Sequence, residues 1–259
     1  MKSLVIIFLL IIPLGFFTKD KKPVHPFYET GYQPGEKLNY TIRFGPIKGG
    51  LATLELEEVV YEGENVYHAK ILGKSTGIVD KIHKVKDIYE SYFNIETGLP
   101  VKSLRNIREG RYRYYNEIIF DRENDIVISS KSGEHPVPKN IQDMVSTFYY
   151  IRRLNYDTIH AGDFIKVNTF FDDDIFSFDI RFEGSGIVRT KLGKFNCLKF
   201  VPLVPTGKIF SLHKDYLTIW ISNDSNLVPI RMKFDLIIGS LKIDLIEYSG
   251  LRSELVNLK

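Results

Sequence analysis

The residue types that most often carry acid–base, nucleophilic or metal chemistry are sparse in this chain, which has six histidines and one cysteine. The histidines are scattered and no two stand at metal-ligand spacing: His25, His68, His83, His135, His160 and His213. The sequence also has no serine-hydrolase elbow, zinc-protease histidine motif, phosphate-binding loop or dinucleotide-binding glycine loop. We therefore expect no catalytic residues, no metal site and no cofactor.

Two of the histidines share a place in similar segments. Thr76–Lys84 and Thr206–Lys214 have Thr, Gly, His and Lys at the same offsets. If both segments lie at one mouth of a barrel, His83 and His213 would meet there, and nearby carboxylates would complete a hydrolytic site. The simpler interpretation is that each histidine is a turn residue within its own module.

The densest acidic cluster is Asp172–Asp174. A calcium loop spaces its oxygen ligands alternately and adds a glycine and a terminal Glu, which is not the pattern here. The cluster separates two alternating runs, which favours a hairpin turn between Phe171 and Ile175. Cys197 lies in the alternating run Phe195–Phe200 without a neighbouring base, so we expect a buried thiol that packs as a small apolar side chain.

A run of arginines and tyrosines could stack on nucleic-acid bases. It comprises Arg105, Arg108, Arg111, Tyr112, Arg113, Tyr114 and Tyr115. Glu109, Glu117 and Asp121 dilute its charge, and the whole chain balances 35 Lys and Arg against 32 Asp and Glu. Nucleic-acid binders normally concentrate basic residues on one face, so we expect a solvated strand face and no nucleic-acid partner.

The elements that must hold these residues are nearly all strands. From Glu36 onward, short alternating runs are separated by turn residues about every 8–12 positions, which is typical of all-β proteins. A hydrophobic fraction of 44%, with 13% aromatic residues, is ample for a packed core. A chain with one cysteine cannot form an internal disulfide, so the fold depends on this core.

One segment changes period, between residues 140 and 153. Its apolar residues are three and four positions apart, which predicts a helix whose buried stripe is Ile141, Met144, Val145 and Phe148. Gln142, Asp143, Ser146 and Thr147 are expected on the opposite face, and Arg152-Arg153 favours the C-terminal end.

The strand-rich halves on either side of this helix, residues 35–135 and 160–252, are similar. In both, a polar turn leads to a proline, Pro100 or Pro229, at the expected start of a strand, where its missing N–H costs no ladder bond. We predict a single domain over 35–252: an antiparallel curved sheet or barrel of two similar β-modules, with the amphipathic helix between them.

The first residues predict export. Lys2 precedes the apolar run Leu4–Phe17, which is too short to span a bilayer but fits a signal peptide over 1–18, followed by an extended tether over 19–34. The expected location is the periplasm or outside the cell. An uncleaved N-terminal membrane anchor is the alternative, because no small-residue cleavage pattern is visible and Lys19, Lys21 and Lys22 come soon after the run.

Several stretches together resemble a bacterial family, domain of unknown function 3108, from about residue 30 to 252. They are Gly35–Tyr40, Gly45–Leu54, Asp87–Tyr92, Leu99-Pro100, Trp220–Asp224, Val228–Ile230 and Gly239–Leu241. The resemblance implies exported proteins without an established activity, and it supplies no site residues. A remoter likeness, to the half-barrel of LolA-like lipoprotein carriers, concerns architecture alone.

Three functions remain open. The first is a non-enzymatic envelope protein that binds an apolar small molecule, a lipid or a lipidated partner inside the curved sheet, with peripheral membrane contact possible. The second is a structural or interaction protein with a dry, closed core, and the third a hydrolytic enzyme with its site at a barrel mouth. The sequence does not identify ligand-binding residues or an oligomeric state.

Overall fold

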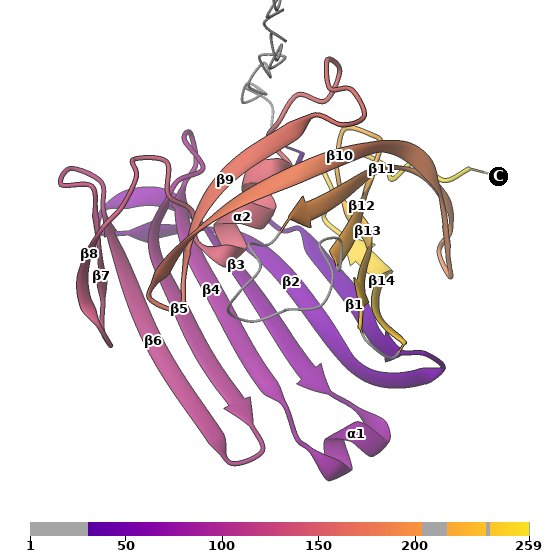
Figure 1. Ribbon diagram of the computed structural model, residues 1–259, viewed down its shortest axis with the longest axis horizontal. Coiled ribbons are helices and arrows are strands. Elements are labelled where there is room, and N and C mark those ends of the chain that lie inside the picture. The colour runs from indigo at the N-terminus through magenta and orange to yellow at the C-terminus, as the bar shows by residue number, and fades with distance from the viewer. Residues whose placement is uncertain (1–30, 204–216, 237–238, 259) are drawn as a thin grey trace, which may run out of the picture.

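The computed structural model describes residues 31–203, 217–236 and 239–258. Fourteen strands and two helices make up this part of the chain (Figure 1). In chain order they are β1 (Lys37–Phe44), β2 (Ile47–Tyr61), β3 (Glu64–Ser75), α1 (Gly77–Ile82), β4 (Lys86–Asn94), β5 (Pro100–Glu109), β6 (Tyr112–Asp121), β7 (Ile126–Ser129), β8 (Gly133–Pro136), α2 (Met144–Ile151), β9 (Phe164–Phe171), β10 (Asp174–Thr190), β11 (Gly193–Leu203), β12 (Leu217–Ser222), β13 (Pro229–Asp235) and β14 (Ser240–Ser249).

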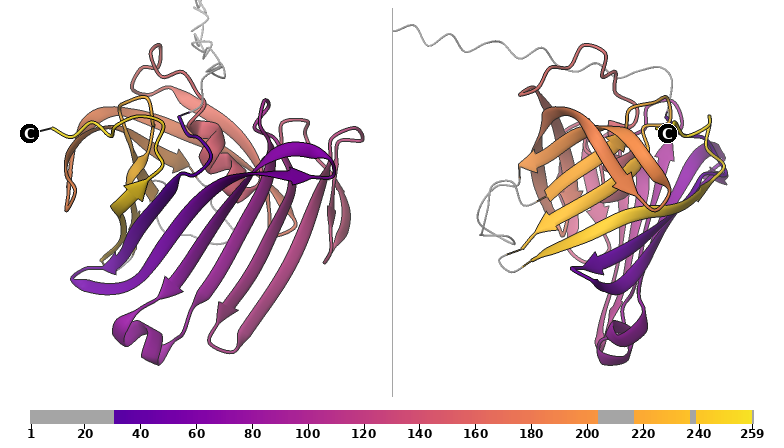
Figure 2. Two further views of the ribbon diagram at one scale, coloured as in Figure 1. Left: turned by 180° about the vertical axis from the view of Figure 1, so that it is seen from behind. Right: turned by 90° about the vertical axis from the view of Figure 1, so that its right-hand side faces the viewer.

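All fourteen strands form one sheet in the order β8-β7-β6-β5-β4-β3-β2-β1-β14-β13-β12-β11-β10-β9. Every strand pair is antiparallel, and the pairing of β1 with β14 joins the two halves of the chain. β8 and β9 are the edges of the described sheet, which curls without closing (Figures 1 and 2). The prediction of an antiparallel curved sheet is confirmed.

The sheet is held in its curl by the turn between β9 and β10. Asp172 and Asp173 have φ values of 55° and 60°, the left-handed geometry of a tight hairpin turn, so the predicted turn is confirmed. Asp172 pairs with Arg105 of β5 at 2.9 Å, and Ser129 of β7 donates to Asp173 at 2.8 Å. These contacts tie one half of the sheet to the other.

Both prolines begin strands as predicted. Pro100 starts β5 and pairs with Phe93, while Pro229 starts β13 and pairs with Ile221. In both strand pairs the register shifts immediately before the residue that pairs with the proline. The two halves therefore share this local geometry. The domain limits 35–252 stay a prediction.

The prediction for the helix was wrong in length and in part of its orientation. α2 spans only Met144–Ile151, because Asp143 caps it: the carboxylate accepts from the backbone N–H groups of Val145 and Ser146. Asp143 and Ser146 are buried and not solvent-facing, since the capping box satisfies their polar atoms, whereas Met144 is 38% exposed.

The other residues of the predicted helix divide between buried and half-buried positions. Gln142, also assigned to the polar face, is buried. Ile141 and Val145 are buried as expected, and Phe148 is half-buried against the core. The single predicted helix is joined by a second, α1, which has no buried residue.

The core lies between α2 and the concave face of the sheet (Figure 2). Tyr149 of α2 packs with Tyr32 and with Phe93 of β4, at ring-centroid distances of 4.8 and 5.3 Å. A second cluster continues from Ile151 onto β9–β12. The lower ends of β1–β6 extend beyond α2 and are not covered by it (Figure 1).

The predicted signal peptide (1–18) lies outside the described residues, as does most of the predicted tether (19–34). In the part that the structure describes, no helix is long and apolar enough to cross a membrane.

Candidate functional site

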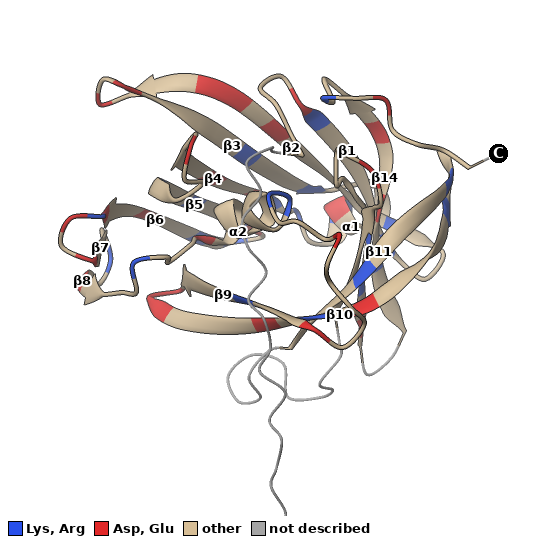
Figure 3. Cartoon of the chain, turned by 90° about the horizontal axis from the view of Figure 1, so that it is seen from above, with Lys and Arg blue, Asp and Glu red and all other residues tan. Residues whose placement is uncertain are grey.

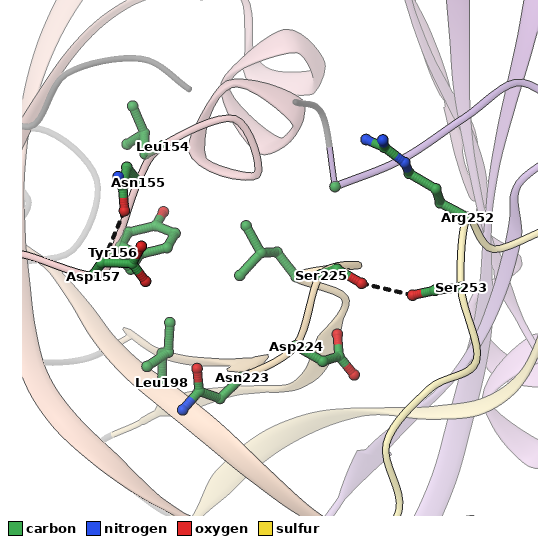
Figure 4. A pocket seen from close by; sticks show the side chains of 12 residues that line it. Leu154, Asn155, Tyr156, Asp157, Leu198, Asn223, Asp224, Ser225, Arg252 and Ser253 are labelled. Atoms are coloured by element: carbon green, nitrogen blue, oxygen red, sulfur yellow. Dashed lines mark hydrogen bonds between the residues drawn. The ribbon is translucent and has the colours of Figure 1, made fainter. Parts of the chain in front are cut away.

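A cleft of about 530 Å³ opens at the end of the molecule where α2 ends (Figure 4). Its walls are the segment 154–157 after α2, the turn between β12 and β13, and the C-terminal segment around Arg252 and Ser253. Gly31, the first described residue, also lines it. The cleft is therefore built by segments that are far apart in the sequence.

Asp224 shapes the β12–β13 wall. Its carboxylate accepts from the Ser222 hydroxyl at 2.8 Å, from the Asn226 backbone N–H at 3.0 Å and from the Val256 backbone N–H at 3.1 Å. The oxygens of Asp224 thus hold the turn and the C-terminal segment in place, which makes this carboxylate a structural group.

The C-terminal wall is fastened to the same turn. The Asn226 side chain donates to the Ser253 carbonyl at 3.1 Å and accepts from the Ser253 N–H at 3.0 Å. The Ser225 and Ser253 hydroxyls are 2.7 Å apart, across the rim of the cleft (Figure 4).

A buried ion pair anchors the cleft to the core. Arg152, the C-cap of α2, donates to both carboxylate oxygens of Glu36 at 2.6 and 2.8 Å, and to the carbonyls of Gly31 and Asn226 at 2.7 and 2.9 Å. Burial opposes the charge on Arg152, yet the Glu36 carboxylate raises the pKa of the guanidinium above its ordinary value. α2, β1 and the cleft are thus tied together.

The floor of the cleft is apolar. Leu154 and Leu198 are buried, and Tyr156 and Leu227 are half-buried beside them. The Tyr156 hydroxyl donates to the Ile151 carbonyl, and burial raises its pKa well above the usual range. Tyr156 therefore presents its ring to the cleft region while its polar atom is satisfied. The cleft combines an apolar floor with a hydrogen-bonding rim.

A second polar region lies inside the curl. Burial raises the pKa of Asp143 to about 6, although it accepts from the Ser91 hydroxyl at 2.5 Å and from the α2 N-terminus. The hollow beside it, between α2, β4, β5 and the β9–β10 turn, measures only about 20 Å³. This is about one water molecule, so the space beneath α2 is packed.

Arg105 faces this interior, which corrects its assignment to a solvated strand face. Its guanidinium lies 4.2 Å from the ring centroid of Phe171 and 4.9 Å from that of Tyr114. Together with the ion pair to Asp172, these contacts join Arg105 of β5 to the β9–β10 turn and so stabilise the curl of the sheet.

The described histidines lie in different parts of the molecule, each with its own neighbours. His68 lies 2.7 Å from Glu90, His135 2.7 Å from the Ser132 hydroxyl, and His160 3.8 Å from Asp163. His83 follows α1, and His25 and His213 lie outside the described residues, so the proposed meeting of His83 with His213 stays a prediction. Among the described residues no three His, Cys, Asp or Glu could hold a metal ion.

Cys197 is fully buried, as predicted, and burial raises the pKa of its thiol to about 12. The thiolate is the reactive form, so this thiol acts as a packing group.

The cleft was not predicted from the sequence. Its rim residues form an ordinary polar turn, Asn223–Ser225, and an unpatterned C-terminal stretch. The one available signal was the polar run that follows a strand and ends at Pro229.

Comparison with known families gives one match over most of the chain. The model of "Protein of unknown function (DUF3108)" matches residues 39–246. The chain belongs to this family. The resemblance noted in the sequence is therefore confirmed. No curated protein matches this DUF3108 chain.

Among solved structures, the fold is similar to a beta-barrel-like protein of domain of unknown function DUF1849 from Brucella abortus. The TM-score is 0.55 at 10% identity, over 85% of this chain and 99% of that one. The hypothetical protein CT021 from Chlamydia trachomatis is a weaker match, with a TM-score of 0.37 at 11% identity over 88% and 93%. The first likeness shows a shared barrel-like fold and leaves function to be argued from the site.

Proposed function

We propose that this protein is a non-enzymatic binding protein of the cell envelope. It takes an amphipathic, lipid-like molecule, or the acyl chain of a lipidated partner, in the cleft between α2, the β12–β13 turn and the C-terminal segment. The observation that carries this proposal is the two-part lining of the cleft, with Leu154, Leu198 and Leu227 below and Ser225, Arg252 and Ser253 at the rim.

The size of the cleft supports the proposal, because ligand pockets commonly measure about 300–1,000 Å³ and are apolar with a few polar groups. The packing beneath α2 moves the expected binding place from the inside of the curl to this surface cleft. Of the two carboxylates that line the cleft, Asp157 and Asp224, the second is engaged in structural hydrogen bonds, which favours binding over catalysis at the β12–β13 turn.

The experiment is a titration of the full chain with a dansyl-labelled fatty acid, followed by dansyl emission. We expect saturable binding. Ser225→Trp places a large ring at the rim of the cleft and should weaken binding about tenfold or more, a cost of ~1.4 kcal/mol. The matched control is Ser132→Trp, in the exposed β7–β8 turn, which should bind as the parent chain does.

Equal binding by the two tryptophan variants would place the fatty acid elsewhere and remove the cleft from the proposal. Absence of saturable binding in all three proteins would favour the alternative, a structural or interaction protein with a dry core. The observation that supports this alternative is the close packing beneath α2, which leaves a hollow of only about 20 Å³.

A further inference from the structure

The lower ends of the strands, which α2 does not cover, carry a line of exposed apolar side chains. From here on, the rim means this surface and not the polar lining of the cleft. It comprises residues 43–48, 77–86 and 108–113, which are the β1–β2 turn, α1 with the residues after it, and the β5–β6 turn. In an up-and-down sheet these connections lie at one end, as Figure 1 shows. The exposed apolar residues of the rim are Phe44, Ile47, Ile78, Ile82 and Tyr112.

The rim segments touch one another, so they form one continuous edge. Beside the β1–β2 turn, the Thr76 N–H that precedes α1 donates to the Gly49 carbonyl at 2.9 Å, and the Gly110 N–H of the β5–β6 turn donates to the Lys84 carbonyl at 2.8 Å. Val85 also forms a β-bridge with Glu109. The exposed apolar side chains of three separate connections therefore lie on a common edge.

Helix α1 is the least explained part of this edge. Its sequence, GIVDKI, is half apolar, yet none of its residues is buried. Ile78 is 64% exposed and Ile82 is 80% exposed, the highest value among large apolar side chains in the part of the chain that the structure describes. Large apolar groups gathered on one exposed edge mark an interaction surface.

The charge of the rim identifies the partner. The rim contains eight Lys and Arg against two Asp and Glu, while the whole chain is almost balanced at 35 against 32. Of the two acidic groups, Asp80 accepts a hydrogen bond from the Ser75 hydroxyl at 2.6 Å. Apolar tips among cations suit a bilayer interface, where hydrocarbon accepts the tips and anionic headgroups accept the cations.

We propose that the rim docks on an anionic lipid bilayer, with α1 and the β1–β2 turn inserted at the headgroup level. This inference goes beyond the proposed ligand binding, because the cleft lies at the opposite end of the sheet and uses none of the rim residues. In the docked orientation the cleft faces away from the lipid.

The test uses an environment-sensitive dye (NBD) on a cysteine placed at Ile82→Cys in the full chain. The matched control is Val60→Cys, since Val60 is 70% exposed at the other end of β2. Cys197 is fully buried and does not compete for the dye in the folded protein. With vesicles of phosphatidylglycerol and phosphatidylcholine, we expect the dye at position 82 to brighten and shift to the blue, and the dye at position 60 to stay unchanged.

Charge reversal tests the electrostatic half of the proposal. Lys81→Glu/Lys84→Glu should weaken binding to these vesicles about tenfold or more. Lys131→Glu/Lys139→Glu changes the net charge equally in the exposed residues around β8 and should bind as the parent chain does. Vesicles of phosphatidylcholine alone should give little response at position 82.

The apolar N-terminal segment is the same in every variant, so any lipid binding that it contributes cancels in these comparisons. Equal dye responses at positions 60 and 82, or equal binding by the two charge variants, would overturn the proposal. A rim that dimerises in light scattering, with no dye response to vesicles, would also overturn it, because a second copy would then cover the edge.

Discussion

The part of the sheet that α2 covers and the rim beyond it differ in how they treat charge. Around α2, charged groups are buried and paired or hydrogen-bonded: Glu36 with Arg152, and Asp143 with Ser91 and the helix N-terminus. At the rim, charged side chains are exposed and apolar ones stand among them. The same strands run through both regions, so the difference comes from what packs on them.

The turns at the α2 end of the first half sharpen this contrast. Residues 61–65, 94–99 and 121–125 together contain six Asp and Glu and one Arg, and Figure 3 shows acidic residues on the turns seen from this end. The rim has the opposite balance. The buried groups that hold the fold together therefore lie around α2, and the exposed apolar and cationic groups lie at the opposite end of the same strands.

The largest effect should follow from breaking the buried ion pair. Arg152→Met leaves the Glu36 carboxylate buried without its partner, which typically costs about 3–5 kcal/mol of unfolding free energy. Urea unfolding measures it. The double variant Glu36→Gln/Arg152→Met should recover part of the loss, because no charge is then left unpaired. A single-variant loss below about 1 kcal/mol would show that the α2 end does not depend on this pair.

A smaller effect, dependent on pH, should come from Asp143. Burial raises its pKa from 3.8 to about 6, so the folded protein keeps a proton that the unfolded chain releases between these values. The resulting stabilisation is present below pH 3.8 and is lost as the pH rises through about 6.

Asp143→Asn keeps a good N-cap and removes the titration. Relative to this variant, the wild type should lose about 2 kcal/mol of unfolding free energy between pH 4 and pH 7, measured by urea unfolding at several pH values. Parallel stability curves for the two proteins would mean that burial does not raise the pKa of Asp143 in the folded protein.

The smallest effect is expected at the rim. Ile82→Ser replaces an 80% exposed side chain in a helix without buried residues, so the unfolding free energy should change by less than about 0.5 kcal/mol. Thermal and urea unfolding check this. A loss above about 1 kcal/mol would show that α1 is packed in solution and would erase the contrast between the two regions.

Local patterns in the sequence were enough for much of the fold. Alternation along single strands predicted the sheet, because side chains on a strand face opposite sides in turn. The turn at Asp172-Asp173, the strand starts at Pro100 and Pro229, and the buried Cys197 also follow from a few neighbouring residues. These features depend on backbone geometry and short-range patterns, which can be read from the sequence alone.

Tertiary structure decided what depends on distant partners. Arg152 and Glu36 are 116 positions apart, and nothing near either residue predicts their pairing. Arg105 was assigned to solvent because its own strand looks charged, but the β9–β10 turn brings Phe171 and Asp172 over it. The helix was predicted too long and partly rotated, since a polar residue counts as solvent-facing until its hydrogen-bond partners are known. The cleft and the rim are both made by segments that become neighbours only when the sheet curls. Strand alternation determines which side chains share a face, while the order and curvature of the strands determine what they meet.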